Sequence, residues 1–166
     1  AFAIQTYPTN SELYLKSARI GFEQGKFTQS LGAVEQALSL SPSSSDSLSL
    51  QAEILSRMDR YEDAIESLSR LRVFAEEPED VLLQMGNVAQ ICRRPIESEA
   101  YYREALLLNP TFEEALFELA FLMESEDKPE VAIEIYEKYL DAYPYASKVW
   151  YNLGNLYRRT SQYEQA

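Results

Sequence analysis

The sequence contains no histidine and a single cysteine. Without histidine, the chain lacks the commonest acid/base group at neutral pH and the commonest zinc ligand. Glycine-rich phosphate loops, metal-spaced Cys/His sets and Ser/His/Asp arrangements are also absent. Carboxylates such as Glu124 and Asp127 are expected to be solvated, so nothing perturbs their pKa values for catalysis. We therefore expect the chain not to be an enzyme and to hold no metal or cofactor.

The lone cysteine, Cys92, excludes an internal disulfide framework and favours a reducing compartment. We expect it to be a small buried hydrophobe rather than a reactive thiol. The chain has no run of about 18 apolar residues, so we expect no membrane span. Residues 1–4 do not resemble a signal peptide. We expect a cytoplasmic protein, and leave open that a signal peptide precedes residue 1 in a longer chain.

Basic residues are scarce, because 15 Lys and Arg stand against 27 Asp and Glu, for a net charge of −12. Binding to phosphates needs clustered Lys and Arg, so this acidic chain is expected to have no nucleic-acid partner. The acid excess is greatest in residues 113–146, which carry ten acids and two lysines. Such a charge run is typical of a solvated face.

The chain repeats with a period of 34 residues and without insertions. One position of each unit is large and apolar: Tyr14, Leu48, Leu82, Leu116 and Trp150. A first small position holds Ala18, Ala52, Gly86, Ala120 and Gly154, and a second holds Ser30, Ala64, Ser98, Ala132 and Ala166. A bulky position follows at Val34, Leu68, Tyr102 and Tyr136, and prolines close units at Pro8, Pro42, Pro110 and Pro144.

These residues resemble the signature of the tetratricopeptide repeat (TPR), which has this period. The resemblance covers the whole chain and implies an all-α fold, a right-handed superhelical solenoid of antiparallel helix hairpins. Residues 1–166 would form a single array, in which 1–10 end a preceding repeat, 11–44, 45–78, 79–112 and 113–146 are full repeats, and 147–166 begin a fifth. Both ends fall inside a repeat, so we expect a fragment of a longer array; the general character of the repeats points to a bacterial TPR protein.

Apolar spacing and turn residues predict the helices of each unit. First helices are expected over 11–24, 45–58, 79–92, 113–126 and 147–160, and second helices over 27–40, 61–74, 95–108 and 129–142. We expect capping boxes at Thr9 with Glu12 and at Thr111 with Glu114. Prolines at positions 95 and 129 suit the first position of a second helix.

The second unit departs from the pattern, because Leu71 replaces the small residue that Ala37 and Ala105 provide, and its proline stands late, at Pro78. Tyr139 is the same kind of departure in the fourth unit. A bulky residue in a close-packed position pushes its neighbours apart. We expect a changed inter-repeat angle between the second and third units.

In the TPR family, first helices line the concave face, where extended peptides or partner helices bind. The resemblance implies that the partner-binding residues are Leu15, Arg19, Phe22, Arg57, Leu83, Asn87, Phe117, Phe121, Tyr151, Asn155 and Arg158. Phe117, Phe121 and Tyr151 lie on a face expected to be wet, which is typical of interface anchors. Alternatively, these three aromatics pack against the neighbouring first helix or against a part of a longer parent protein. Leu15 and Arg19 replace the lysine and asparagine of TPR domains that clamp a C-terminal carboxylate, which disfavours that ligand.

The predicted function is a protein-protein interaction scaffold that binds a peptide or partner helix in the concave groove. A regulatory or targeting segment of a larger enzyme stays open as an alternative, and so does a self-association module. For the latter, Trp150, Leu153, Leu156 and Tyr157 lack the second helix of their own unit. We expect these side chains to expose an apolar stripe through which a homo-oligomer could form.

Overall fold

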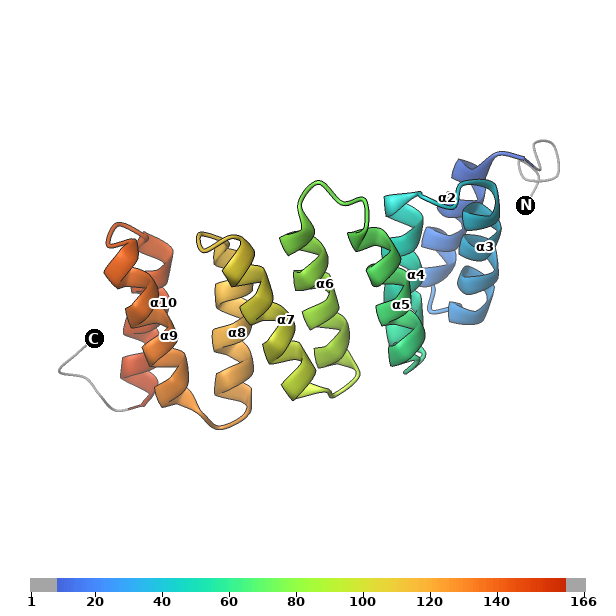
Figure 1. The fold of residues 1–166 in the computed structure, drawn as a ribbon. Helices are drawn as coiled ribbons and strands as arrows, with labels where there is room; N and C mark the ends of the chain where they lie inside the picture. Colours follow the sequence, from blue (N-terminus) through green and yellow to red (C-terminus); the bar gives the residue numbers. More distant parts are fainter. Residues whose placement is uncertain (1–8, 161–166) are drawn as a thin grey trace. The chain divides into compact units, whose positions relative to one another are not determined.

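The computed structural model describes residues 9–160, which form nine α-helices and no strand (Figure 1). The helices are α2 (Ser11–Glu23), α3 (Phe27–Leu40), α4 (Ser45–Arg57), α5 (Tyr61–Arg72), α6 (Pro78–Ile91), α7 (Pro95–Leu108), α8 (Glu113–Ser125), α9 (Pro129–Ala142) and α10 (Ser147–Arg159). Every predicted helix is present, with ends within two residues of those expected. The fold is an all-α helical-repeat fold, as the 34-residue pattern predicts.

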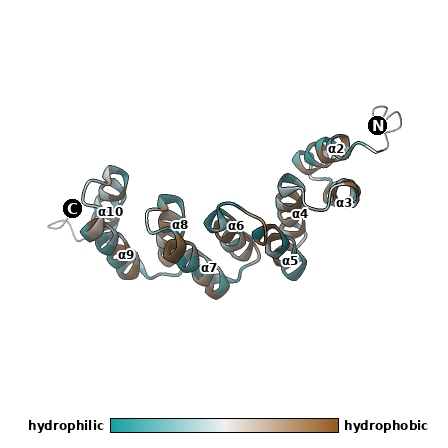
Figure 2. Ribbon diagram, turned by 45° about the horizontal axis from the view of Figure 1, so that its top comes forward, coloured by the Kyte–Doolittle hydropathy of each residue, from teal (hydrophilic) through white to brown (hydrophobic). Residues whose placement is uncertain are grey.

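The chain divides into two compact units, residues 1–101 and 102–166, with the boundary inside α7. In the first unit, α2 packs against α3 and α4 against α5, and successive hairpins meet where α3 contacts α4 and α5 contacts α6. In the second unit, α9 packs against both α8 and α10. Hydrophilic and hydrophobic residues are mixed along each drawn helix (Figure 2), so each helix has apolar side chains to bury against a neighbour.

The two small positions of a repeat face each other inside the hairpin. Ser30 Oγ donates a hydrogen bond to the carbonyl oxygen of Ala18 at 2.7 Å, and Ser98 Oγ donates to that of Gly86 at 3.0 Å. These bonds cross from a second helix to the backbone of the first helix, which only small residues allow. Both serines are buried, with 1% and 0% of their surface exposed. The small positions therefore set how closely the two helices of a hairpin approach.

The turn inside each hairpin uses one backbone motif, repeated at the 34-residue period. One residue of each turn, two positions after the last residue of the first helix, has a positive φ. This residue is Gly25 at 70°, and Asp59, Arg93 and Asp127 at 58°. In the first hairpin, the Lys26 amide donates to the Gly21 carbonyl at 2.9 Å and the Gly25 amide to the Phe22 carbonyl at 2.9 Å. Equivalent bonds close α4, α6 and α8. This C-cap satisfies carbonyls at the helix end that would otherwise lack a partner.

The irregular turn of the second repeat has a physical cause in Pro78. Other turns between repeats contain a hydrogen bond from the fourth residue to the first, as from the Ser44 amide to the Ser41 carbonyl at 3.2 Å. Pro78 stands at the donor position and has no amide hydrogen. There α5 ends at Arg72, two residues early, and α6 begins at Pro78 itself. The changed inter-repeat angle stays a prediction.

The predicted capping box at Thr9 and Glu12 is wrong. Asn10 is the N-cap of α2, and its Oδ1 accepts hydrogen bonds from the amides of Glu12 and Leu13 at 3.0 and 3.3 Å. Asparagine is among the best N-cap residues, because its short side chain reaches these free amides. The helix therefore uses the better of two adjacent caps.

The second predicted capping box, at Thr111, is also wrong. Phe112 is the N-cap of α8 and provides no side-chain cap. Thr111 instead bonds to Asn109, whose Oδ1 accepts from both the amide and the hydroxyl of Thr111 at 3.1 and 2.8 Å. By contrast, Pro95 and Pro129 begin α7 and α9 as predicted.

Candidate functional site

The first helices of the second unit, α8 and α10, border two adjoining pockets. One, of about 320 Å³, is lined by Phe117, Phe121, Glu124, Tyr136, Asn152, Asn155, Leu156 and Arg159. The other is lined by Phe117, Ser147, Lys148, Tyr151 and Asn152. The two pockets share Phe117 and Asn152, so they adjoin each other. We call the two pockets together the α8–α10 groove.

An ion pair joins α8 to α10 at each end of this groove. Lys148 Nζ lies 3.6 Å from Glu113 Oε2 near the helix starts, and an Arg159 guanidinium nitrogen lies 2.6 Å from Glu124 Oε2 near the helix ends. The two helices therefore run in the same direction, one repeat apart. The Glu124 side chain is only 16% exposed, so the expectation of a solvated carboxylate is wrong for Glu124. Its neighbour in that expectation, Asp127, is exposed in the turn.

The floor of the groove is aromatic. The rings of Phe117 and Tyr136 pack at an angle of 57° with centroids 6.3 Å apart. Burial raises the pKa of Tyr136 to about 12, the nearby Glu124 carboxylate adds to this rise, and a hydrogen bond with Asn152 opposes it. Tyr136 is therefore neutral at physiological pH. Phe117 is half-buried. It is a packing residue as well as a lining residue, so replacing it by Ala would also cost stability.

The rim of the groove carries exposed aromatic and amide groups. Phe121 is 59% exposed and Tyr151 is 71% exposed, which is unusual for side chains of this size. Asn155 lies between them and the Arg159 end, half-buried, and its Oδ1 accepts a hydrogen bond from Arg158 at 3.0 Å. Aromatic surfaces next to amide donors and acceptors can hold apolar side chains and peptide backbone together.

Three family models, each described as a tetratricopeptide repeat, match residues 15–80, 114–144 and 135–166. Together they cover most of the chain. The chain belongs to the tetratricopeptide repeat family. No curated protein sequence matches it.

Solved TPR structures with the same fold include YrrB, described as a TPR protein with an unusual peptide-binding site. It is 20% identical, with a TM-score of 0.60, and the match covers 96% of this chain and 82% of YrrB. PilW, described as a type IV pilus biogenesis factor, is 18% identical with a TM-score of 0.69, covering 98% and 77%. PilF of Pseudomonas aeruginosa is 21% identical with a TM-score of 0.64, covering 92% and 70%. At these identities the similarity establishes the fold alone.

Of the predicted TPR binding residues in the second unit, the structure brings four into the groove. Phe117, Phe121 and Asn155 line one pocket, and Tyr151 lines the adjoining one. Arg158 is exposed beside them and contacts Asn155. Asn152 and Tyr136 also line the groove, although neither was predicted as a groove residue. Tyr136 was read only as a core position of its repeat, and no pattern in the sequence distinguishes Asn152.

In the first unit, the predicted residues on α2 make specific contacts. Leu15 is half-buried, and the exposed Arg19 guanidinium lies 3.9 Å from Asp46 of α4. Phe22 is half-buried and packs against Phe27, with ring centroids 5.7 Å apart. Phe22 is therefore a packing residue inside the first hairpin.

The remaining predicted residues of the first unit do not form one site. Arg57 lies beside the hairpin turns, where it lines a pocket with Met58 and residues 25–29. Leu83 and Asn87 are half-buried on α6 and line none of the pockets described above. Within the TPR array, the second unit therefore holds the best-formed candidate site.

The predicted apolar stripe on α10 is not exposed. Leu153 and Leu156 are each 2% exposed and Tyr157 is 6% exposed, because α9 covers this face of α10. The Tyr157 hydroxyl donates a hydrogen bond to Glu137 of α9. Of the four residues, only Trp150 is exposed, at 52%. The expectation of an exposed stripe is therefore wrong, and these buried side chains give no reason to expect self-association through α10.

The lone cysteine is buried at the end of α6, as expected, and burial raises the pKa of the Cys92 thiol. Within residues 9–160, no group of three or more His, Cys, Asp and Glu side chains could hold a metal ion. None of the helices in that range is long and apolar enough to span a membrane.

Proposed function

We propose that this TPR chain is a protein-interaction scaffold and that the α8–α10 groove binds an extended peptide. The observation that carries the proposal is the pair of exposed aromatics, Phe121 and Tyr151, on adjacent first helices beside the amides of Asn152 and Asn155. Exposed aromatic side chains lose little conformational freedom on binding and are frequent anchors at interfaces. The printed description of YrrB as peptide-binding is in line with this proposal.

The chemistry of the groove restricts the partner. Lys148 and Arg159 are each already paired with a carboxylate of α8, so neither cation depends on the partner for a counter-charge. One or two large apolar side chains suit the surfaces of Phe121 and Tyr151. The Asn152 and Asn155 amides can pair with the backbone of the same peptide. Arg158 at the edge offers a partner for one acidic residue.

The test begins with peptides selected from a random display library on the wild-type chain. Their dissociation constants are then measured by fluorescence anisotropy on the wild type and on a double variant with Phe121→Ala and Tyr151→Ala. Losing two anchors of this kind is expected to weaken binding at least about tenfold, since a single anchor commonly contributes about 2 kcal/mol. Tyr145→Ala is the matched control, because Tyr145 is 96% exposed and lies outside the groove.

Equal affinity of the double variant and the control would refute the groove assignment. Failure to select any saturably binding peptide would refute peptide binding itself. Both variants change exposed side chains, so the helical circular dichroism signal should be the same in all three proteins.

A further inference from the structure

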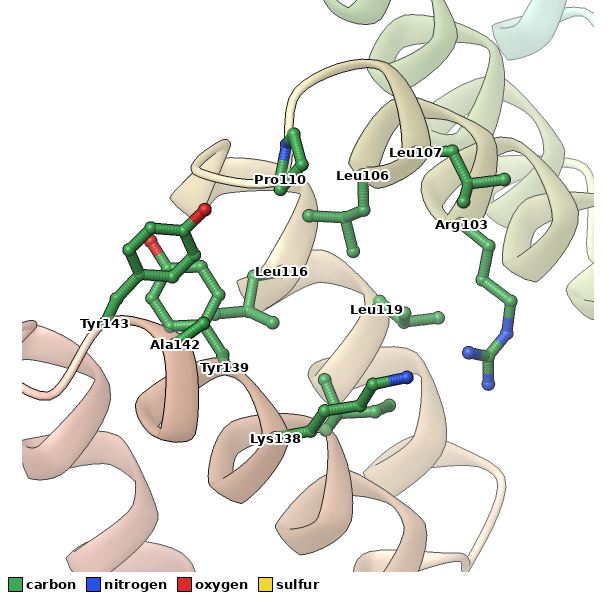
Figure 3. Close-up of a pocket in the computed structure, with 11 residues that line it drawn as sticks. Arg103, Leu106, Leu107, Pro110, Leu116, Leu119, Lys138, Tyr139, Ala142 and Tyr143 are labelled. Carbon is green, nitrogen blue, oxygen red and sulfur yellow. The ribbon is translucent and has the colours of Figure 1, made fainter.

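The second unit has another pocket, which shares no residue with the α8–α10 groove (Figure 3). It has a volume of about 450 Å³ and lies between the second helices α7 and α9, over α8. Its lining is mainly apolar: Leu106, Leu107, Pro110, Leu116, Leu119, Ile135, Ala142, Tyr139 and Tyr143, with Arg103 and Lys138. Leu107 is 81% exposed, so part of this apolar lining is open to solvent.

One wall of this pocket is a tyrosine pair that the other repeats lack. The rings of Tyr139 and Tyr143 lie 4.8 Å apart between centroids, and the Tyr139 hydroxyl donates a hydrogen bond to the Thr111 carbonyl at 3.4 Å. The positions equivalent to Tyr139 hold Ala37, Leu71 and Ala105, and those equivalent to Tyr143 hold Ser41, Ala75 and Asn109. The stacking pattern of the repeat does not require these tyrosines, so the pocket is a property of the fourth repeat.

The other end of the pocket is cationic. The amino group of Lys138 and the guanidinium group of Arg103 both lie at the end away from Tyr143 (Figure 3). Glu134 and Asp141 stand one helical turn from Lys138 on α9, at spacings that commonly form ion pairs. Nevertheless, in the part of the chain that the structure describes, Lys138 forms no ion pair. Two cations from different helices at one pocket end favour an anionic group between them.

We propose that this pocket is a second, independent docking site for a peptide segment that carries a large apolar side chain next to acidic residues. The apolar side chain enters between the tyrosine pair and Leu106, and the carboxylates meet Lys138 and Arg103. Charge complementarity argues for this occupant, because two cationic side chains stand together at one end of this pocket although the whole chain has a net charge of −12. The volume suits side chains of a short segment.

The probe, called the glutamate peptide, is a fluorescein-labelled peptide with a leucine-phenylalanine pair beside two glutamates. A control, the glutamine peptide, has glutamine in place of both glutamates. Saturable binding of the glutamate peptide is expected, weakened at least about tenfold in the glutamine peptide. Leu107→Asp and Lys138→Glu should each weaken binding of the glutamate peptide by at least about tenfold. Lys26→Glu, an equal charge change in the first unit, is the matched control and should leave the affinity unchanged, as should Phe121→Ala with Tyr151→Ala.

The proposal is overturned if the glutamate peptide does not bind, if it binds the two pocket variants as tightly as the wild type, or if only the Phe121 and Tyr151 variant loses affinity. Sedimentation velocity tests a second copy of the chain as the occupant. A concentration-dependent dimer that Leu107→Asp abolishes would replace the peptide proposal. Each site is tested by its own variants, so refuting peptide binding in this pocket would not refute peptide binding in the α8–α10 groove.

Discussion

Gly21 and Ser30 should be energetically coupled, because the two residues approach so closely in the first hairpin that no room is left for one more atom at Gly21. A methyl group added at Gly21 would lie 2.6 Å from Ser30 Oγ, closer than real Cβ contacts allow, but 3.7 Å from Ser30 Cα and Cβ, which is ordinary van der Waals contact. The clash is therefore with a single hydroxyl oxygen. That same oxygen donates the 2.7 Å hydrogen bond to the Ala18 carbonyl. Gly21→Ala must displace it.

The magnitude follows from three effects. Replacing glycine by alanine inside a helix gains about 1 kcal/mol. Loss of the buried Ser30 hydrogen bond costs about 1 kcal/mol, and the residual crowding costs about 1 kcal/mol more. Gly21→Ala alone should therefore destabilise the chain by about 1 kcal/mol. When Ser30→Ala is already present, only the helix gain remains, so Gly21→Ala should stabilise by about 1 kcal/mol, a coupling of about 2 kcal/mol.

The assay is equilibrium urea unfolding followed by circular dichroism at 222 nm for the wild type, both single variants and the double variant. Gly32→Ala is the matched control, since a methyl group there meets no atom within 4 Å. It should give the same small stabilisation whether position 30 is serine or alanine. If Gly21→Ala has the same effect in both backgrounds, the close approach of Gly21 to Ser30 is not what limits this hairpin.

Three further perturbations test other parts of the account. Burial raises the pKa of Tyr136 and Tyr157 to about 12, against about 10 in an unfolded chain. The folded state then holds these protons more tightly than the unfolded chain, so the unfolding free energy should fall as pH rises from about 10 to 12. An ultraviolet titration in which every tyrosine has a pKa near 10 would contradict this. Asn10→Ala should cost about 1 kcal/mol of unfolding free energy and Thr9→Ala clearly less; equal losses would refute the cap assignment. Arg93→Gly should raise the unfolding free energy by about 0.5 to 1 kcal/mol, because Arg93 has a φ of 58°, which glycine adopts more easily. A lowered urea midpoint would argue against the positive φ at this position.

The fold could be predicted because the 34-residue pattern couples local and tertiary structure. Small residues such as Ala18 and Ser30 stand at helix contacts in the four full repeats that the structure describes, so the pattern fixes helix position and partner at once. The caps could not be predicted as well, since Thr9 and Asn10 are adjacent and both can cap a helix. The early end of α5 at Arg72 was not predicted, because only the hydrogen bonds of the other turns show that Pro78 stands where an amide donor is needed.

The candidate site was predicted in part. Helical spacing places Phe121 and Tyr151 on first helices, but whether an aromatic residue is exposed depends on its neighbours. Phe117 has the same spacing and is half-buried against Tyr136. The pocket between α7 and α9 was not predicted, because the sequence shows only that Tyr139 is large for its position, whereas the structure places it in the wall of a cavity.

Photo-crosslinking can show whether an extended peptide binds in the α8–α10 groove. A benzoylphenylalanine side chain is placed at position 121 in one protein and at position 145 in another, and each is irradiated with a library-selected peptide at its dissociation constant. The account predicts a covalent adduct at position 121 and none at position 145. Adducts in equal yield at both positions, or none at position 121 while the peptide is bound, would contradict it.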